Sequence, residues 1–198
     1  MFKLLVSADL LIPFMPRYYR RRYTRVVKPK KKWATNIVEI DCNSNDATLG
    51  GVGTKNVWML KKICENSVGG ATPTPVIVKT GNFKLQFDAT FGLSVGAPLQ
   101  FSGYLIYVPE GTFPSYSVDY FKQFVQKHPE WILCWKYGSY DYVTSGANGN
   151  IDSIKVSSRL KRNLNSGDAI CFFGMATSTQ NIDSAGGHGM CQFWTCAN

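Results

Sequence analysis

The clearest pattern along the chain is the strict alternation of apolar and polar residues over residues 83–89. It predicts a strand with one face on a core and the other face in solvent. Residues 99–108 are almost continuously apolar and aromatic, which predicts a strand covered on both faces. Shorter runs predict further strands at residues 37–40, 131–137, 154–160, 169–175 and 190–195. The alternation in residues 131–137 favours a place in the core for Trp131 and Trp135.

Two segments show helical spacing instead. Val57, Leu60, Ile63 and Cys64 recur at helical intervals, and residues 117–127 place their apolar side chains on one side. Few crossover helices favour an antiparallel sandwich over a parallel α/β sheet. We therefore predict an all-β fold, a single eight-stranded antiparallel jelly-roll sandwich with short helices in its loops.

The charge of the chain is concentrated at one end. The formal net charge is +9, and residues 17–32 contain nine basic residues and no acidic one. From Ala34 onward, 12 Lys and Arg residues face 12 Asp and Glu residues, so this part is neutral. This layout is typical of a folded module with a tail that binds a polyanion. We divide the chain into an N-terminal extension with a basic arm, residues 1–33, and a jelly-roll domain, residues 34–198.

The arm mixes cations with aromatic rings, as a binder of single-stranded nucleic acid requires. Guanidinium groups suit phosphates, and aromatic faces offer stacking surfaces for unpaired bases. The predicted nucleic-acid-binding residues are Arg17, Tyr18, Tyr19, Arg20, Arg21, Arg22, Tyr23, Arg25, Lys28, Lys30, Lys31, Lys32 and Trp33. Such binding should weaken steeply with salt and ignore base identity. A nuclear-localisation signal or a solubilising tail is the alternative, and residues 28–32 would serve as an import signal.

A second basic group has two interpretations. Lys155, Arg159, Lys161 and Arg162 lie on one predicted strand or in the loop after it. They form either an ordinary solvated face or an extension of the basic surface inside a shell. The run Gly186-Gly187-His188-Gly189 has no strand-to-helix context that would hold a phosphate, so we expect a surface turn there.

The sequence carries none of the common enzyme signatures, and we predict no catalytic residue, metal site or cofactor. It has no P-loop, no G-x-S-x-G and no H-E-x-x-H motif. The six cysteines include no C-x-x-C pair, and with only two histidines no zinc pattern can be written. Because the cysteines fall in strand-like apolar stretches, we expect reduced core thiols rather than a disulfide framework.

Residues 1–14 begin like a signal peptide, with Lys3 before an apolar run. Asp9 interrupts that run, no small-x-small cleavage site follows, and the run is too short to span a bilayer. We expect an upstream extension, with Met15 as a natural start, or a small packing segment. No membrane partner is predicted.

Several motifs resemble a known family when they are taken in order. After the Arg- and Tyr-rich start come Thr80-Gly81-Asn82-Phe83-Lys84, Tyr107-Val108-Pro109-Glu110-Gly111, His128-Pro129-Glu130-Trp131-Ile132, Ser158-Arg159-Leu160 and Asn163-Leu164-Asn165-Ser166-Gly167-Asp168. Together they resemble the capsid proteins of circovirus-like viruses, which are small circular single-stranded DNA viruses that encode a replication initiator. The resemblance runs from Met15 to about Phe173, and residues 1–14 depart from it.

The resemblance implies a viral capsid protein with a single jelly roll, assembled into an icosahedral T=1 shell of 60 copies. The arm would point inward to the packaged single-stranded DNA genome. The expected locations are the virion and, during assembly, the host nucleus, with host nuclear import machinery as a partner. The host receptor or glycan is left open. The alternative is a cellular nucleic-acid-binding β-domain protein, ribosome- or chromatin-associated, and a third possibility is a carbohydrate-binding jelly roll with an incidental import signal.

Overall fold

Most of the described chain is β-strand. The computed structural model describes residues 32–43, 49–67, 77–93, 95–112, 123, 125–143, 149–150 and 153–197, which all belong to one unit, Lys31–Asn198. The strands are β1 (Ala34–Cys42), β2 (Leu49–Gly50), β3 (Thr54–Glu65), β4 (Val78–Leu93), β5 (Ala97–Val108), β6 (Ile132–Val143), β7 (Gly149–Asn150), β8 (Ile154–Leu164) and β9 (Ala169–Ala197). A short 3-10 turn, η1 (Pro129–Trp131), precedes β6. The predicted antiparallel, mostly β class is confirmed.

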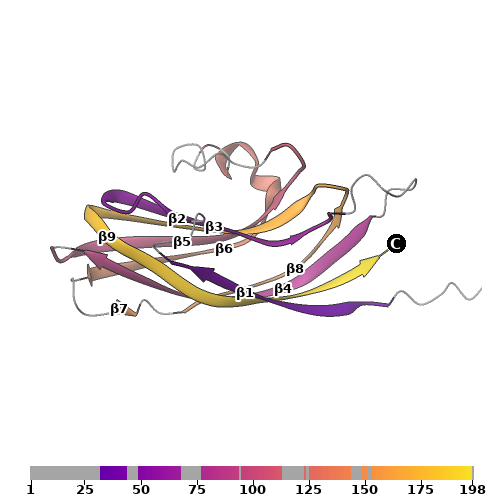
Figure 1. The fold of residues 1–198 in the computed structure, drawn as a ribbon, viewed down its shortest axis with the longest axis horizontal. Helices are drawn as coiled ribbons and strands as arrows, with labels where there is room; N and C mark the ends of the chain where they lie inside the picture. The colour runs from indigo at the N-terminus through magenta and orange to yellow at the C-terminus, as the bar shows by residue number, and fades with distance from the viewer. Residues whose placement is uncertain are drawn as a thin grey trace, which may run out of the picture. The chain divides into compact units, whose positions relative to one another are not determined.

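The long strand β9 belongs to two layers of paired strands (Figure 1). Its C-terminal part, residues 182–197, lies between β1 and β4, and β4 pairs with β8, giving the order β1-β9-β4-β8. Its N-terminal part, residues 169–178, lies between β3 and β5, giving β2-β3-β9-β5-β6. We call these sets layer 1 and layer 2. One strand therefore ties both layers together along its length.

The main core lies between the layers. On β4 the odd-numbered residues from Phe83 to Leu93 face inward, and the even-numbered Lys84 and Gln86 face solvent, as the alternation predicted. The ring of Phe87 lies 4.6 Å from that of Phe172 on β9 in layer 2. Burying each such side chain stabilises the fold by roughly 1.5–3 kcal/mol.

A second cluster covers the outer face of layer 2. Trp58, Ile106 and Phe173 are buried there, and Val125 and Trp131, from the segment between β5 and β6, pack against them. Figure 1 shows this segment above the layer. Strand β5 is therefore covered on both faces in its C-terminal half, as predicted.

The same covering explains why the helix predicted around Val57 is wrong. That segment is β3, with Val57 and Met59 facing the main core and Trp58 and Leu60 facing the second cluster. When both faces of a strand are buried, apolar residues follow one another without alternation, and their spacing can imitate a helix. For the second predicted helix, Gln123 and residues 125–127 are helical, and the rest of residues 117–127 lies outside the described residues.

Two further predictions are wrong. Trp135 is 60% exposed rather than in the core. A register shift between β5 and β6 makes Leu133 an extra inward residue, so the alternation is reversed after it and Trp135 faces outward.

Gly187 and Gly189 lie within β9 rather than in a turn. A Cβ atom on Gly187 would stand 2.2 Å from the ring of Phe87, and one on Gly189 would stand 2.3 Å from the carbonyl oxygen of Gln86. The glycines let β4 lie close against β9.

All six cysteines are in the described residues, and no disulfide joins them. Four are buried and two are half-buried, as expected of core thiols. Burial raises the pKa of Cys171 and of Cys191 to about 12. Within the residues that the structure describes, no helix has the length and apolar character needed to cross a bilayer.

Candidate nucleic-acid interface

Most of the predicted binding arm lies outside the described residues. This applies to Arg17, Tyr18, Tyr19, Arg20, Arg21, Arg22, Tyr23, Arg25, Lys28, Lys30 and Lys31. Its last two residues, Lys32 and Trp33, are described and exposed, and they lead directly into β1 at Ala34. The site can therefore be built from the point where the arm joins layer 1.

The end of the arm meets the opposite edge of layer 1. The Nζ atom of Lys161, on β8, lies 5.5 Å from the ring centroid of Trp33, a cation–π arrangement. Because β9 and β4 separate β1 from β8, this contact requires the chain to turn across the outer face of the layer. Gly81 leaves room for it, since a Cβ atom there would stand 2.8 Å from Cγ of Lys161.

Cross-strand register arranges the outer face of layer 1 in rows. Moving away from the arm, the rows are Thr35, Trp194, Gly81 and Lys161; then Ile37, Gln192, Lys84 and Ser157; then Glu39, Met190, Gln86 and Lys155; then Asp41, His188 and Asp88. Lys161, Lys84 and the indole of Trp194 lie in the two rows next to the arm, the third row holds both Lys155 and Glu39, and the last row holds Asp41 and Asp88. The face is therefore polarised, with its basic and aromatic end at the arm.

The structure brings together three of the four basic residues predicted on β8. Lys155, Arg159 and Lys161 are exposed; their rows place Lys155 and Lys161 on the outer face of layer 1, and Arg159 lies at the register shift between those rows. Arg162 is half-buried and donates a hydrogen bond from its guanidinium to the carbonyl oxygen of Glu130 in η1. Arg162 therefore fastens η1 to β8, away from the basic face.

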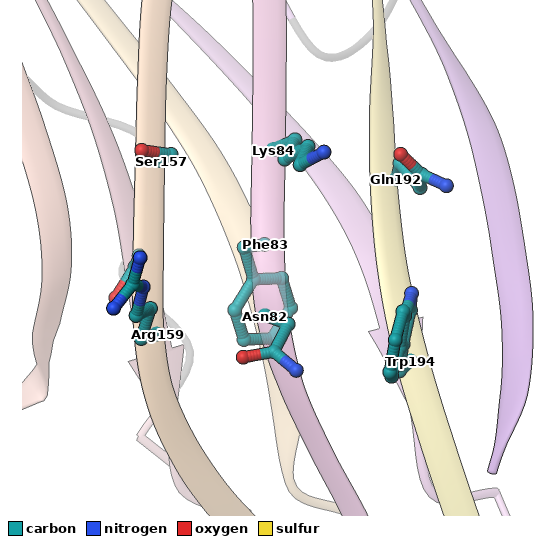
Figure 2. A pocket seen from close by; sticks show the side chains of 8 residues that line it. Asn82, Phe83, Lys84, Ser157, Arg159, Gln192 and Trp194 are labelled. Carbon is teal, nitrogen blue, oxygen red and sulfur yellow. The ribbon is translucent and has the colours of Figure 1, made fainter.

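A groove opens in the basic end of this face where the pairing of β4 is interrupted. Asn82 has a φ of 54°, in the left-handed region, and the register shifts beside it toward both β8 and β9. Such bulges re-aim side chains. The groove has a volume of about 410 Å³ and is lined by Asn82, Lys84, Ser157, Arg159, Gln192 and Trp194, with Phe83 and Ser158 buried beneath (Figure 2).

Five lining residues of this groove were not predicted as site residues from the sequence: Asn82, Lys84, Ser157, Gln192 and Trp194. Lys84 was placed on the solvent face of its strand, and Trp194 was placed within a predicted strand, but the two are 110 positions apart. Only the pairing of β4 with β9 brings them to the same groove, with Lys84 opposite Gln192 and Trp194 opposite Gly81. The one sequence signal was the Gly81-Asn82 pair, which interrupts an otherwise regular strand.

The two cations of the groove have no ionic partner within the described chain. Lys84 and Arg159 are its only charged lining residues, and the described salt bridges, Lys62 with Glu65 and His128 with Glu130, lie elsewhere. Trp194 is 41% exposed beside them. The groove thus offers two positive charges and a flat ring to a ligand, and no group within it suggests bond-breaking chemistry.

Two motifs from the sequence meet around Asp168, which is only 4% exposed. Its carboxylate accepts hydrogen bonds from the hydroxyl of Tyr107 at 2.7 Å, from the backbone N–H of Glu110 at 3.1 Å and from that of Asn165 at 2.8 Å. Burial, followed by the hydrogen bond to Asp168, raises the pKa of Tyr107 to about 12. This network ties the end of β5 to the turn between β8 and β9, so its role is structural.

Comparison of the chain with protein-family models and with curated proteins finds no match. The function is therefore inferred from the arm and from the face of layer 1 that it meets.

Proposed function

We propose that this protein is the capsid protein of a circovirus-like virus. It self-assembles into an icosahedral T=1 shell of 60 copies and packages circular single-stranded DNA through residues 17–33. The observation that carries the proposal is the confinement of the whole net charge to an arm whose last residue, Trp33, joins the basic end of layer 1. A packaging protein needs this combination of a charged arm and a neutral body that can pack against copies of itself.

The strand order supports a jelly roll for the body. In a double Greek key, eight strands form two facing sheets of four. The orders β1-β9-β4-β8 and β3-β9-β5-β6 agree with such an arrangement if β9, with 29 residues, supplies one strand to each sheet. The two-residue strands β2 and β7 are then additions at the margins.

Exposed aromatic side chains on an edge strand support self-assembly. Strand β6 pairs only with β5 among the described strands, and it exposes Trp135 and, to 47%, Tyr137. Large apolar groups at an unpaired edge favour contact with another chain. We assign the contacts between copies to this edge and to the loops of the body, and no catalytic role to the protein.

The same arm would bind host nuclear import machinery, so that the protein acts in the host nucleus during assembly and in the virion afterwards. Residues 28–32 have the composition of an import signal.

Negative-stain electron microscopy of the purified protein, with and without nuclease, tests the proposal. We expect uniform closed shells whose nucleic acid resists nuclease. A cellular ribosome- or chromatin-associated protein would remain a monomer or a small oligomer, and that result would overturn the capsid assignment. Glycan binding without shell formation would favour a carbohydrate-binding protein instead.

A further inference from the structure

We infer that the groove between Lys84, Arg159 and Trp194 binds one nucleotide of the packaged strand, with its two flanking phosphates held by Lys84 and Arg159 and its base stacked on the indole. The inference rests on the proposed function and adds a defined site on the folded body to the arm. It also assigns the outer face of layer 1 to the side of the body that meets the genome.

The shape of the groove follows from the break in pairing on both sides of β4. On the β8 side the register shifts between Gly81 and Phe83, and on the β9 side it shifts between Gly81 and Lys84. Phe83 remains buried below the break, and its ring stacks on that of Phe193 with the two centroids 5.9 Å apart. This contact fixes the interrupted part of β4 to the core. The hollow is therefore part of the folded sheet and does not depend on a loop.

The charge of the groove matches a phosphate. Its lining contains Lys84 from β4 and Arg159 from β8 and no carboxylate. In Figure 2 the two side chains come from adjacent strands, with the Lys84 ammonium turned toward Gln192 and the Arg159 guanidinium turned to the side of β8 away from β4. An arginine can donate two parallel hydrogen bonds to phosphate oxygens, and a lysine adds a point charge. The two cations, which have no ionic partner among the described residues, are thus suited to successive phosphates of one strand.

The indole of Trp194 matches a base. Figure 2 shows the ring edge-on beside Asn82, so it stands up from the sheet and one face is turned toward the groove. Stacking on an aromatic ring tolerates any base, because every base has a π-face. The side-chain amides of Gln192 and Asn82 lie on the same lining and can donate to or accept from a base edge.

Position relative to the arm favours a nucleic acid over a sulfated glycan, which could also use cations and a ring. Trp194 and Lys161 lie in the same cross-strand row, and Lys161 contacts Trp33. A strand held by the arm would reach the groove directly. Beyond the groove, Asp41 and Asp88 in the last row would repel it, so its path is confined to the basic end of the face.

Photo-crosslinking of the full chain tests the site. The probe is a single-stranded oligodeoxynucleotide containing 5-iododeoxyuridine, and the crosslinked peptides are mapped by mass spectrometry. We expect crosslinks at Trp194 in addition to those in the arm. The double variant K84A/R159A should lose the Trp194 crosslink. The matched control K55A/K136A removes the same two charges from exposed positions on β3 and β6 and should keep it.

Affinity measurements give a second readout. Trp194→Ala should weaken binding of oligothymidylate by at least about fivefold, because stacking of one base contributes about 1–3 kcal/mol. Trp194→Phe should retain most of the affinity. K84A/R159A should also reduce the slope of log K against log salt by about 1.4 if each cation neutralises one phosphate. Unchanged far-UV circular dichroism and melting temperature show that each variant is folded.

The outcomes separate this inference from the proposed function. Crosslinks confined to the arm would overturn the groove and leave packaging by the arm intact. Absence of both crosslinking and binding would overturn both. If a heparin fragment protects Trp194 from chemical modification while the oligonucleotide does not, the groove is a glycan site and the inference is wrong.

Discussion

The hydroxyl of Tyr107 donates a hydrogen bond of 2.7 Å to Oδ2 of Asp168, which lies 61 residues further along the chain. Two backbone N–H groups, of Glu110 and Asn165, donate to the same carboxylate. Asn66 extends the connection, since its N–H donates to the carbonyl oxygen of Asp168 at 3.0 Å. The ends of β3, β5 and β8 are therefore held together at one buried acidic residue.

Asp168→Ala should be strongly destabilising, because it leaves the Tyr107 hydroxyl and two N–H groups without an acceptor. Each unsatisfied donor costs about 1–3 kcal/mol when buried. We expect a loss of about 3 kcal/mol or more in the free energy of unfolding, measured by urea denaturation, and a smaller loss for Tyr107→Phe, which removes one hydrogen bond. A change below about 0.5 kcal/mol for Asp168→Ala, the size of an ordinary surface substitution, would contradict this role.

The raised pKa of Tyr107 predicts a loss of stability at high pH. The pKa of Tyr107 is about 12 in the fold against 10.0 for an unperturbed tyrosine, so the folded protein keeps a proton that the unfolded chain releases. The stabilisation is complete below pH 10 and is lost as the pH rises from 10 toward 12. Unfolding free energies of the wild type should fall more steeply over this window than those of Tyr107→Phe. Parallel curves would show that the hydrogen bond is absent in solution.

The buried thiols should be unreactive in the folded protein. Desolvation raises the pKa of Cys64 and Cys134 to about 11, so very little thiolate is present at neutral pH. Titration with Ellman's reagent at pH 8 should be slow without denaturant and should detect six thiols in guanidinium chloride without any reductant. Fewer than six under those conditions would reveal a disulfide. Rapid reaction without denaturant would contradict the burial.

Gly187→Ala and Gly189→Ala should both destabilise the fold. The new methyl groups would meet the Phe87 ring and the Gln86 carbonyl oxygen at distances that no Cβ atom tolerates, so β9 and β4 must separate. Overpacking of this kind costs about 1–3 kcal/mol or more. Gly53→Ala serves as a comparison for the crowding effect, because nothing lies within 4 Å of its Cβ position, although its φ of 85° adds strain. Thermal melting of the three variants should place Gly189→Ala lowest, and equal melting temperatures would contradict the close packing.

Sequence patterns predicted those strands that have one buried face and one solvent-exposed face. Strand β4 was found because Phe83, Leu85 and Phe87 alternate with polar residues. Strand β3 was mistaken for a helix because its two faces are both buried. The length of β9 was also not predicted, since its glycines, which pack against Phe87, look locally like a turn. Local patterns report one strand at a time, and they carry no information on which strand lies beside it.

The candidate site was predicted in part: the basic residues were identified from the sequence, and the groove was not. The charge count found the arm, and the outward positions of β8 identified Lys155, Arg159 and Lys161. The groove was not predictable, because Lys84 and Trp194 become neighbours only through the register of β4 with β9. The structural role of Arg162 depends in the same way on its contact with Glu130, 32 residues earlier in the chain.

The most direct measurement is the nucleic-acid content of nuclease-treated particles formed by the full chain and by a variant that lacks residues 15–33. The account predicts that the full chain protects single-stranded DNA, seen in the ratio of absorbance at 260 and 280 nm and by extraction. The deletion variant should keep the circular dichroism spectrum of a folded β protein and retain no nucleic acid at physiological salt. Equal nucleic-acid retention by the two proteins would contradict the assignment of packaging to the arm.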